Sequence, residues 1–263
     1  MLVGDPTTTG VRRRAVRVEV EPDAYVSWRA SRIGITTERL ERRVILQLAG
    51  DVCGRMVLDV GCGDGTLALV LAKLGATVTG IDSSPAMIDA ARMRARHHGA
   101  DISFERSNAE WLPFHPEEFD IVTAVTVLCF LEDAQTVLRE IARALKPGGR
   151  LIMGELGRWS PWALGRRIRA WRGVPLWRHA RFRTARELRD LVEGAGLVVE
   201  TVRGAIYYPR WASAARWMSP YDPLLGRLTT LGGAFVALSA RKPEVYPRSL
   251  ASLREGQCPG LRA

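Results

Sequence analysis

The stretch that decides the fold spans residues 57–65 and reads Val-Leu-Asp-Val-Gly-Cys-Gly-Asp-Gly, an apolar strand that ends in a glycine-rich turn. Glycine has no Cβ atom, so Gly61, Gly63 and Gly65 can adopt backbone angles closed to other residues and let a ligand approach the main chain. Residues 66–74 follow with apolar side chains at helical spacing. The stretch therefore predicts the first half of a strand-helix-strand unit.

An aspartate follows the second strand of this unit. Residues 76–81 read as the returning strand, and Asp82 follows it, seventeen residues after Gly65. A carboxylate at this place can accept hydrogen bonds from both hydroxyls of a ribose. A glycine turn taken alone also has a purely steric explanation, because tight strand-to-helix turns use glycine. The turn and Asp82 together indicate a nucleoside cofactor.

Three further segments match in order along the chain. Residues 108–114 read Asn-Ala-Glu-Trp-Leu-Pro-Phe, residues 121–127 form an apolar strand, and residues 145–149 read Leu-Lys-Pro-Gly-Gly before another strand. This ordering resembles the class I S-adenosylmethionine-dependent methyltransferases. The resemblance is close over about residues 55–154 and looser over 25–242. It is strongest to the small-molecule branch that includes the ubiquinone and menaquinone biosynthesis C-methyltransferases.

The resemblance implies a cofactor, S-adenosyl-L-methionine, and a set of residues that bind it. The turn from Gly61 to Gly65 and the preceding aspartate would hold the methionine moiety, and Asp82 the ribose. Asn108 and Ala109 would border the adenine; many relatives have Asp in place of Asn108, but an amide oxygen can still accept from the adenine amino group. The full set is Asp59, Gly61, Gly63, Gly65, Asp82, Ser83, Asn108, Ala109 and Thr126.

A general base is harder to assign. Relatives often carry His after the fourth strand, whereas residues 128–131 here read Leu-Cys-Phe-Leu. Glu155, at the end of the fifth predicted strand, is the best-placed catalytic candidate. The alternative, which the sequence favours, is that it binds a polar substrate group or faces solvent. Lesser candidates are His179, Tyr207 and Tyr208. The motif by which related enzymes methylate the amino groups of bases is absent, which argues against that reaction.

From Arg55 onward the pattern predicts an α/β fold: a Rossmann-like doubly wound sheet, mostly parallel with an antiparallel edge strand, and helices on both faces. Thr184 and Glu187 predict a capping box. We expect one domain over residues 21–243, with a mobile tail at 1–20 and a flexible one at 244–263. The predicted strands lie near 56–60, 77–81, 102–105, 120–126, 149–155, 197–203 and 233–240. The predicted helices lie near 65–74, 85–98, 134–145 and 184–194.

Composition identifies no partner. The formal charge is +10, but 35 of the 38 basic residues are Arg, a skew that GC-rich coding alone can produce. The cysteines at 53, 62, 129 and 258 have neither metal-ligand spacing nor the density of a disulfide scaffold, so we expect a cytoplasmic protein without a metal. The longest apolar run is too short to cross a bilayer.

Substrate identity should reside in two segments outside the cofactor framework, residues 156–183 and 205–230. The first contains four tryptophans and eight arginines, and a helix there would place Leu164, Ile168 and Trp171 on one face. Such a helix can rest on an anionic membrane and admit a lipid or quinone-like acceptor. The alternative, which the sequence favours, is a lid that packs this apolar face on its own domain, with arginines solvated or stacked on Trp162. Nucleic acid ranks below both.

The N-terminal part of the fold is expected to cover the cofactor mouth. Residues 25–48 have helical stretches with apolar residues at amphipathic spacing. Tyr25 and Trp28 are candidates to cap the cofactor, and core packing of the two rings is an equal alternative.

Two rival functions remain open at this point. An NAD(P)-dependent oxidoreductase could use the same turn and the same acidic residue, but its fingerprint is Gly-x-Gly-x-x-Gly, whereas the spacing here is Gly-x-Gly-x-Gly. A non-catalytic domain could bind the cofactor while its basic segment recruits a partner or a membrane.

Overall fold

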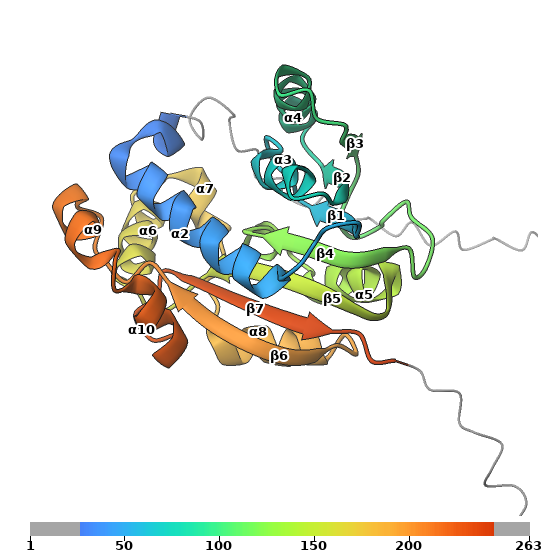
Figure 1. The fold of residues 1–263 in the computed structure, drawn as a ribbon. Coiled ribbons are helices and arrows are strands. Elements are labelled where there is room, and N and C mark those ends of the chain that lie inside the picture. The colour runs from blue at the N-terminus through green and yellow to red at the C-terminus, as the bar shows by residue number, and fades with distance from the viewer. Residues whose placement is uncertain (1–26, 245–263) are drawn as a thin grey trace, which may run out of the picture.

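A computed structural model describes residues 27–244 of the chain, and its centre is one seven-stranded sheet (Figure 1). The strand order is β3-β2-β1-β4-β5-β7-β6. The strands are β1 (Met56–Val60), β2 (Thr77–Asp82), β3 (Ser103–Arg106), β4 (Phe119–Val125), β5 (Leu145–Leu156), β6 (Val198–Ala205) and β7 (Phe235–Arg241).

Strands β1 to β5 are parallel neighbours, and the two last strands form the predicted antiparallel edge. β7 pairs antiparallel with both β5 and the outermost strand β6. The sheet order reverses beside β1, because the chain first winds outward to β2 and β3 and then returns to β4 on the other side of β1. Ligands of such sheets bind beyond the carboxyl ends of the strands at this point.

Helices cover both faces of the sheet, as predicted (Figure 1). Alternate residues of the strands point into two separate cores: Val57 belongs to the core that includes α2, α3 and α4, and Leu58 to the core under α5 and α8. The helical segments are α2 (Arg32–Ala49), α3 (Thr66–Lys73), α4 (Pro85–His97), η1 (Leu128–Phe130, a 3-10 turn), α5 (Ala134–Ala144), α6 (Pro161–Trp171), α7 (Pro175–Arg178), α8 (Ala185–Glu193), α9 (Ala212–Met218) and α10 (Asp222–Leu228).

The predicted elements agree with the observed ones to within a few residues. The capping box at the start of α8 is present, since the Thr184 side chain accepts from the Glu187 amide and the Glu187 carboxylate from the Thr184 amide. The largest difference is β5, which begins at Leu145 because that residue already pairs with Phe119 across a bulge. Residues 1–20 and 245–263, for which tails were predicted, lie outside the described residues.

Helix α2 covers the sheet rather than the cofactor mouth, which corrects the sequence-based expectation. Its amphipathic face buries Leu40, Val44 and Ile45, and the helix packs across β5, β6 and β7. Its N-cap is Ser31, whose side chain accepts from the Gly34 amide. The short helical stretch before it, residues 27–30, is the part that reaches toward the glycine-rich turn.

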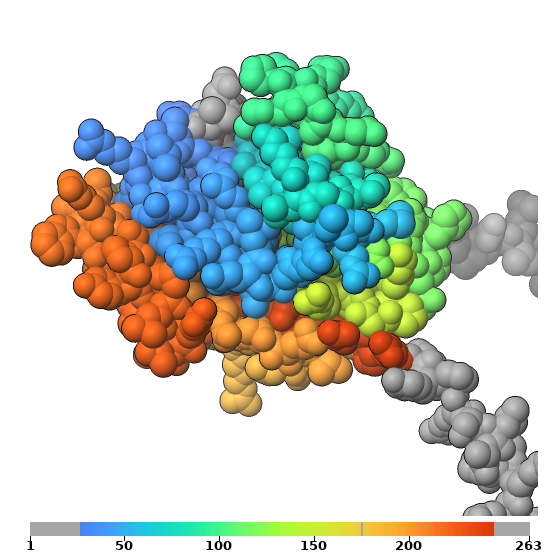
Figure 2. Space-filling view, in the orientation of Figure 1, coloured from blue at the N-terminus to red at the C-terminus, as the bar shows by residue number. Residues whose placement is uncertain are grey.

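Helix α6 packs on the protein with the face opposite to the one predicted for a lid. Its buried residues are Trp162, Ala163 and Arg166, whereas Leu164, Ile168 and Trp171 are 61%, 42% and 87% exposed. The predicted stacking of an arginine on Trp162 is confirmed, but the apolar face does not pack on the rest of the protein. The space-filling view shows α9 and α10 (orange) against α2 at one end of the molecule (Figure 2). Among the described residues no helix is both long and apolar enough to cross a membrane.

Candidate active site

The glycine-rich turn after β1 has the backbone that the sequence predicts. Gly61, Gly63 and Gly65 have φ angles of +67°, +53° and +74°, in the left-handed region that favours glycine. A Cβ atom on Gly61 would lie 2.3 Å from Val127 Cγ2, and one on Gly65 would lie 2.9 Å from Ala91 Cβ. A Cβ on Gly63 would meet no described atom within 4 Å. The turn is thus packed from behind at Gly61 and Gly65 and open at Gly63.

Asp82 ties the end of β2 to this turn. Its Oδ2 accepts a hydrogen bond from the Gly63 amide at 3.0 Å, and its Oδ1 accepts one from the Ser84 amide at 2.9 Å. Ser84 is also the N-cap of α4, so one carboxylate fixes both the turn and the start of the next helix. Each oxygen keeps a further lone pair for a ligand hydroxyl.

Asp59 lies at the floor of the site with one oxygen unpaired. Its Oδ1 accepts a hydrogen bond from the Thr123 hydroxyl at 2.6 Å, while its Oδ2 is buried and has no partner among the described residues. Burial raises the pKa of Asp59 to about 7, and the nearby Asp82 carboxylate acts in the same direction. An unpaired buried carboxylate oxygen costs free energy unless a ligand supplies a donor.

An ionic cluster around Asp64 was not predicted. Arg29 Nη1 lies 2.8 Å and 2.9 Å from the two Asp64 carboxylate oxygens, and Arg94 Nη2 lies 2.6 Å from Oδ2. Arg29 also contacts Glu38 of α2. Ion pairs therefore hold the glycine-rich turn between the short helical stretch at residues 27–30 and helix α4. The sequence does show Asp64 inside the turn, but its two arginine partners lie 35 residues before it and 30 residues after it, so the pattern could not identify them.

The remaining predicted cofactor positions lie along the same edge of the sheet. Ser83 directly follows Asp82 and is exposed. Asn108 is exposed beyond β3, where its Oδ1 accepts from the Glu110 amide at 3.2 Å, and Ala109 packs at the margin of the core under α5. Thr126, after β4, has a φ of +57°, an unusual angle for this residue type, and its amide donates to Gly154 O at 2.7 Å. The structure thus brings the predicted positions to one edge.

Glu155 is fully buried at the end of β5 and holds the turn after β4. Its Oε1 accepts from the amides of Val127 and Leu128, at 3.2 and 2.8 Å, and its Oε2 has no described hydrogen-bond partner. Burial raises its pKa to about 7, against the opposing effect of the nearby Arg183. The Arg183 guanidinium donates to Leu128 O at 3.0 Å. Of the alternatives left open for Glu155, exposure to solvent is wrong.

The lesser candidates are mostly structural. Tyr208 is buried, with its hydroxyl 3.0 Å from Thr37 Oγ1, and the Tyr207 hydroxyl donates to Thr229 O. Burial raises the pKa of each phenol to about 12, which makes them poor bases. His179 is exposed at the end of α7. Of the predicted capping pair, Trp28 packs against the core under α2 and Tyr25 lies outside the described residues.

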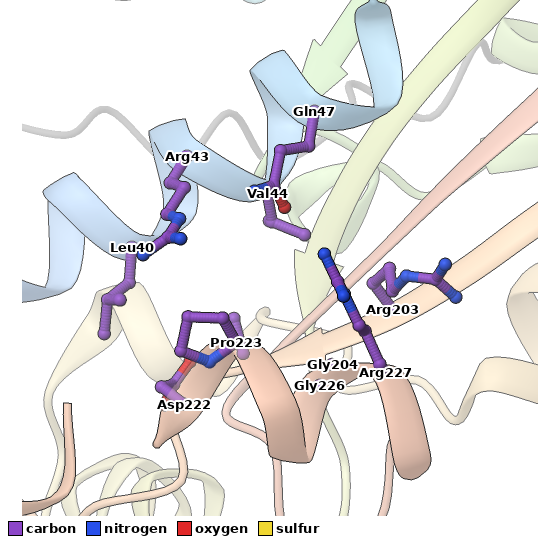
Figure 3. Close-up of a pocket in the computed structure, with 11 residues that line it drawn as sticks. Leu40, Arg43, Val44, Gln47, Arg203, Gly204, Asp222, Pro223, Gly226 and Arg227 are labelled. Atoms are coloured by element: carbon purple, nitrogen blue, oxygen red, sulfur yellow. The ribbon is translucent and has the colours of Figure 1, made fainter. Parts of the chain in front are cut away.

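A small pocket of about 20 Å³ opens elsewhere, between α2, β6 and α10 (Figure 3). Arg43, Arg203 and Arg227 contribute to its wall, and Arg43 and Arg227 project into the gap between the two helices. The Asp222 carboxylate at its base already accepts from the Ile206 and Tyr207 amides. No residue of the glycine-rich turn lines this pocket, so it is separate from the candidate site. Within residues 27–244 no group of three His, Cys, Asp or Glu could hold a metal ion.

Comparison with known proteins gives a consistent picture. A family model described as a methyltransferase domain matches residues 58–153. A ubiquinone biosynthesis O-methyltransferase of Aeromonas salmonicida is 34% identical over 171 residues, which cover 63% of this chain and 72% of that protein. The enzyme of the same name from Thiobacillus denitrificans is 36% identical over 164 residues, covering 60% and 71%.

A solved structure agrees with the sequence relatives. The crystal structure of a Thermotoga maritima S-adenosylmethionine-dependent methyltransferase, described as a possible histamine N-methyltransferase, superposes with a TM-score of 0.61 at 25% identity. The match covers 84% of this chain and 95% of that one.

Proposed function

Since the chain belongs to the S-adenosylmethionine-dependent methyltransferases, we propose that it transfers a methyl group to an oxygen of a small, quinol-like acceptor. The chain is a methyltransferase that uses S-adenosyl-L-methionine. Neither an NAD(P)-dependent oxidoreductase nor a non-catalytic cofactor-binding domain fits this membership. The acceptor class is the proposal, and its support is that the curated relatives described above carry the name of ubiquinone biosynthesis O-methyltransferases.

The observation that supports the cofactor assignment is the buried Oδ2 of Asp59, which has no partner among the described residues and belongs to the strand that leads into the turn, open at Gly63. The cofactor's methionine moiety carries an ammonium group, which is the kind of donor that a buried carboxylate lacks here. We assign the ribose hydroxyls to Asp82, with Ser83 beside them. We assign the adenine to Asn108 and Ala109, and Thr126 to the floor between them. Bound there, the cofactor supplies an electrophilic methyl group on a sulfonium.

Glu155 is our candidate for the base that takes the proton of the acceptor hydroxyl. Its free Oε2 can hold a proton, and a pKa near 7 matches that task at neutral pH. The two amide bonds to Oε1 fix the carboxylate, so its second oxygen has a defined direction. The Glu155 carboxylate lies beside η1, whose Leu128 amide donates to Oε1, and we place the acceptor hydroxyl on this side. The dry surroundings favour reaction of an anionic oxygen.

We also infer that the enzyme associates peripherally with anionic membranes, where a lipid-like acceptor would be presented. Residues 156–183 include eight Arg and neither Asp nor Glu, and the exposed face of α6 carries Leu164, Ile168 and Trp171. Arginine and tryptophan suit the lipid interface. In residues 205–230 the only acidic residue is Asp222, which is buried, while Trp211 and Trp217 are exposed.

Vesicle flotation tests this association. We expect the protein to float with vesicles of phosphatidylglycerol and phosphatidylcholine at low salt and to sink with phosphatidylcholine alone. Trp171→Ala should weaken flotation, while Trp111→Ala, which removes a tryptophan of similar exposure from the loop after β3, should not. If the wild-type protein does not float with the anionic vesicles at low salt, the inferred membrane association is refuted.

Methyl transfer itself is tested with labelled cofactor. We expect purified protein to bind S-adenosylhomocysteine and to transfer label to catechols and short-chain quinols. Asp82→Ala should weaken cofactor binding, whereas Asp89→Ala, an exposed carboxylate on α4, should leave it unchanged. Binding of the cofactor product without transfer to any phenolic oxygen would refute the proposed acceptor class. Absence of binding would refute the site assignment.

A further inference from the structure

Arg166, on the buried side of α6, is a charged side chain that stacks on two aromatic rings and has no hydrogen bond or ion pair among the described residues. Its guanidinium carbon lies 5.4 Å from the centre of the Trp162 ring and 5.0 Å from that of Trp177. The Nη1 atom is buried, and within residues 27–244 the guanidinium makes no hydrogen bond and no ion pair. A buried charge in this state is costly, and natural folds retain one where something else pairs with it.

The charges around Arg166 leave an excess of positive charge. Arg169 and Arg210 lie near enough to oppose its protonation, and Arg210 stacks on Trp162 with 5.1 Å between its guanidinium carbon and the ring centre. The Glu41 carboxylate of α2 acts in the opposite direction, and the described residues show no ion pair between it and Arg166. Burial lowers the pKa of Arg166 to about 10 and raises that of Glu41 to about 7.

The position of Arg166 puts it on the acceptor side of the site. Helix α6 begins five residues after β5 ends at Leu156. The Trp177 ring, on which Arg166 stacks, packs against the apolar cluster that contains Cys129 of η1 and Leu156. The two indole rings limit access to the guanidinium faces. Its N–H donors lie in the plane of the group, so an oxyanion can approach along the rim.

We propose that Arg166, assisted by Arg210, binds a carboxylate on the methyl acceptor. This inference rests on the proposed function and deepens it by giving the acceptor a negative charge. A carboxylate matches the planar, forked donor set of a guanidinium. A monoanion also fits better than a dianion, because Glu41 faces the same guanidinium.

Calorimetry on full-length protein saturated with S-adenosylhomocysteine tests the carboxylate subsite. The probes are 3,4-dihydroxybenzoate and 3,4-dihydroxybenzamide, which are similar in shape and differ in charge. We expect the acid to bind about 10- to 100-fold more tightly, the range of a charge-assisted hydrogen bond. Arg166→Gln should abolish this preference and leave the amide affinity unchanged. Arg167→Gln, one residue along and exposed, is the matched control and should keep it.

A second variant keeps the proposal testable if Arg166→Gln does not fold. Glu41→Gln removes the competing carboxylate and should tighten the acid several-fold without affecting the amide. The proposal is overturned if the wild type binds neither probe, if it binds both equally, or if either variant leaves the preference as it was. Failure of S-adenosylhomocysteine to bind would instead refute the cofactor assignment. The binding of S-adenosylhomocysteine and the binding of the two probes are measured in separate titrations, so the two failures can be told apart.

Discussion

Three glycine-to-alanine variants separate what the glycine-rich turn does for folding from what it does for binding. Gly61, Gly63 and Gly99 have positive φ angles of similar size, +67°, +53° and +61°. They differ in what surrounds them: Val127 crowds Gly61, while Gly63 and Gly99 have no described atom within 4 Å of a built Cβ. Gly99 follows α4 and stands apart from the candidate site, so it reports the backbone cost alone.

The structure gives an expected size for each effect. Alanine at positive φ costs roughly 1–2 kcal/mol, reduced by about 0.4–1 kcal/mol because alanine also restricts the unfolded chain. Gly63→Ala and Gly99→Ala should therefore each lower the free energy of unfolding by about 1 kcal/mol. At Gly61 the 2.3 Å approach to Val127 Cγ2 adds an overpacking cost of about 1–3 kcal/mol. Gly61→Ala should thus cost about 2–4 kcal/mol, and Val127→Ala should restore part of it.

Cofactor affinity should follow a different order from stability. The methyl group of Gly63→Ala would point into the side of the turn that is open, where we place the cofactor. We expect at least a tenfold weaker binding of S-adenosylhomocysteine, about 1.4 kcal/mol, with stability matching that of Gly99→Ala. Urea unfolding and calorimetry measure the two quantities. Wild-type affinity in Gly63→Ala would refute our placement of the ligand against this turn.

Three further outcomes follow from the charged groups of the site. Arg29→Ala should lower the free energy of unfolding by about 1–3 kcal/mol, because the buried Asp64 carboxylate then keeps Arg94 as its one ion-pair partner among the described residues. Arg42→Ala, which breaks a more exposed ion pair, should change it by less than about 0.5 kcal/mol in the same urea assay. Burial raises the pKa of Asp59 to about 7, so its contribution to the stability of the fold should be greatest below pH 4 and be lost as the pH rises to about 7. The affinity for S-adenosylhomocysteine should change in the opposite direction and weaken up to tenfold for each pH unit below 7, because the protonated carboxyl no longer attracts the ammonium group. Calorimetry should no longer detect this pH dependence in Asp59→Asn. Glu155→Gln should lower kcat and remove the acidic limb of the pH–rate profile near 7 while leaving cofactor affinity intact, and an unchanged profile would exclude Glu155 as the base.

The sequence predicted the parts of the molecule that local chemistry determines. A glycine-rich turn after an apolar strand specifies positive φ angles, and alternating strands and helices specify a parallel sheet. Because parallel strands share one carboxyl edge, Asp59, Asp82 and Glu155 could be brought to one edge of the sheet without knowing any contact. The capping box at Thr184 is a four-residue signal of the same local kind.

Pairings between distant segments could not be predicted in this way. The Arg29 to Asp64 clamp joins residues 35 positions apart, and any of the many arginines could have been the partner. Periodicity grouped Leu164 with Ile168 and Trp171 correctly, but a helical pattern does not say which of two faces is buried. In α6 the burial of Trp162 decided it, because its indole N–H donates to Tyr208 O at 2.7 Å and its ring meets that of Tyr208.

The unpaired polar atoms give a common reason for the assignments made at this edge of the sheet. Among the described residues, the buried side-chain atoms without a partner are Asp59 Oδ2, Gln135 Nε2, Glu155 Oε2 and Arg166 Nη1. Native folds leave few such atoms. Asp59 and Glu155 lie near the carboxyl ends of β1 and β5, and Arg166 lies in α6, the helix that follows β5. Along the chain, the order of these groups is the Asp59 carboxylate, the Glu155 carboxylate and the Arg166 guanidinium. This order complements a cationic cofactor head at Asp59, an acceptor proton at Glu155 and an acceptor anion at Arg166, so one substrate complex would supply each atom with the partner that the protein leaves out.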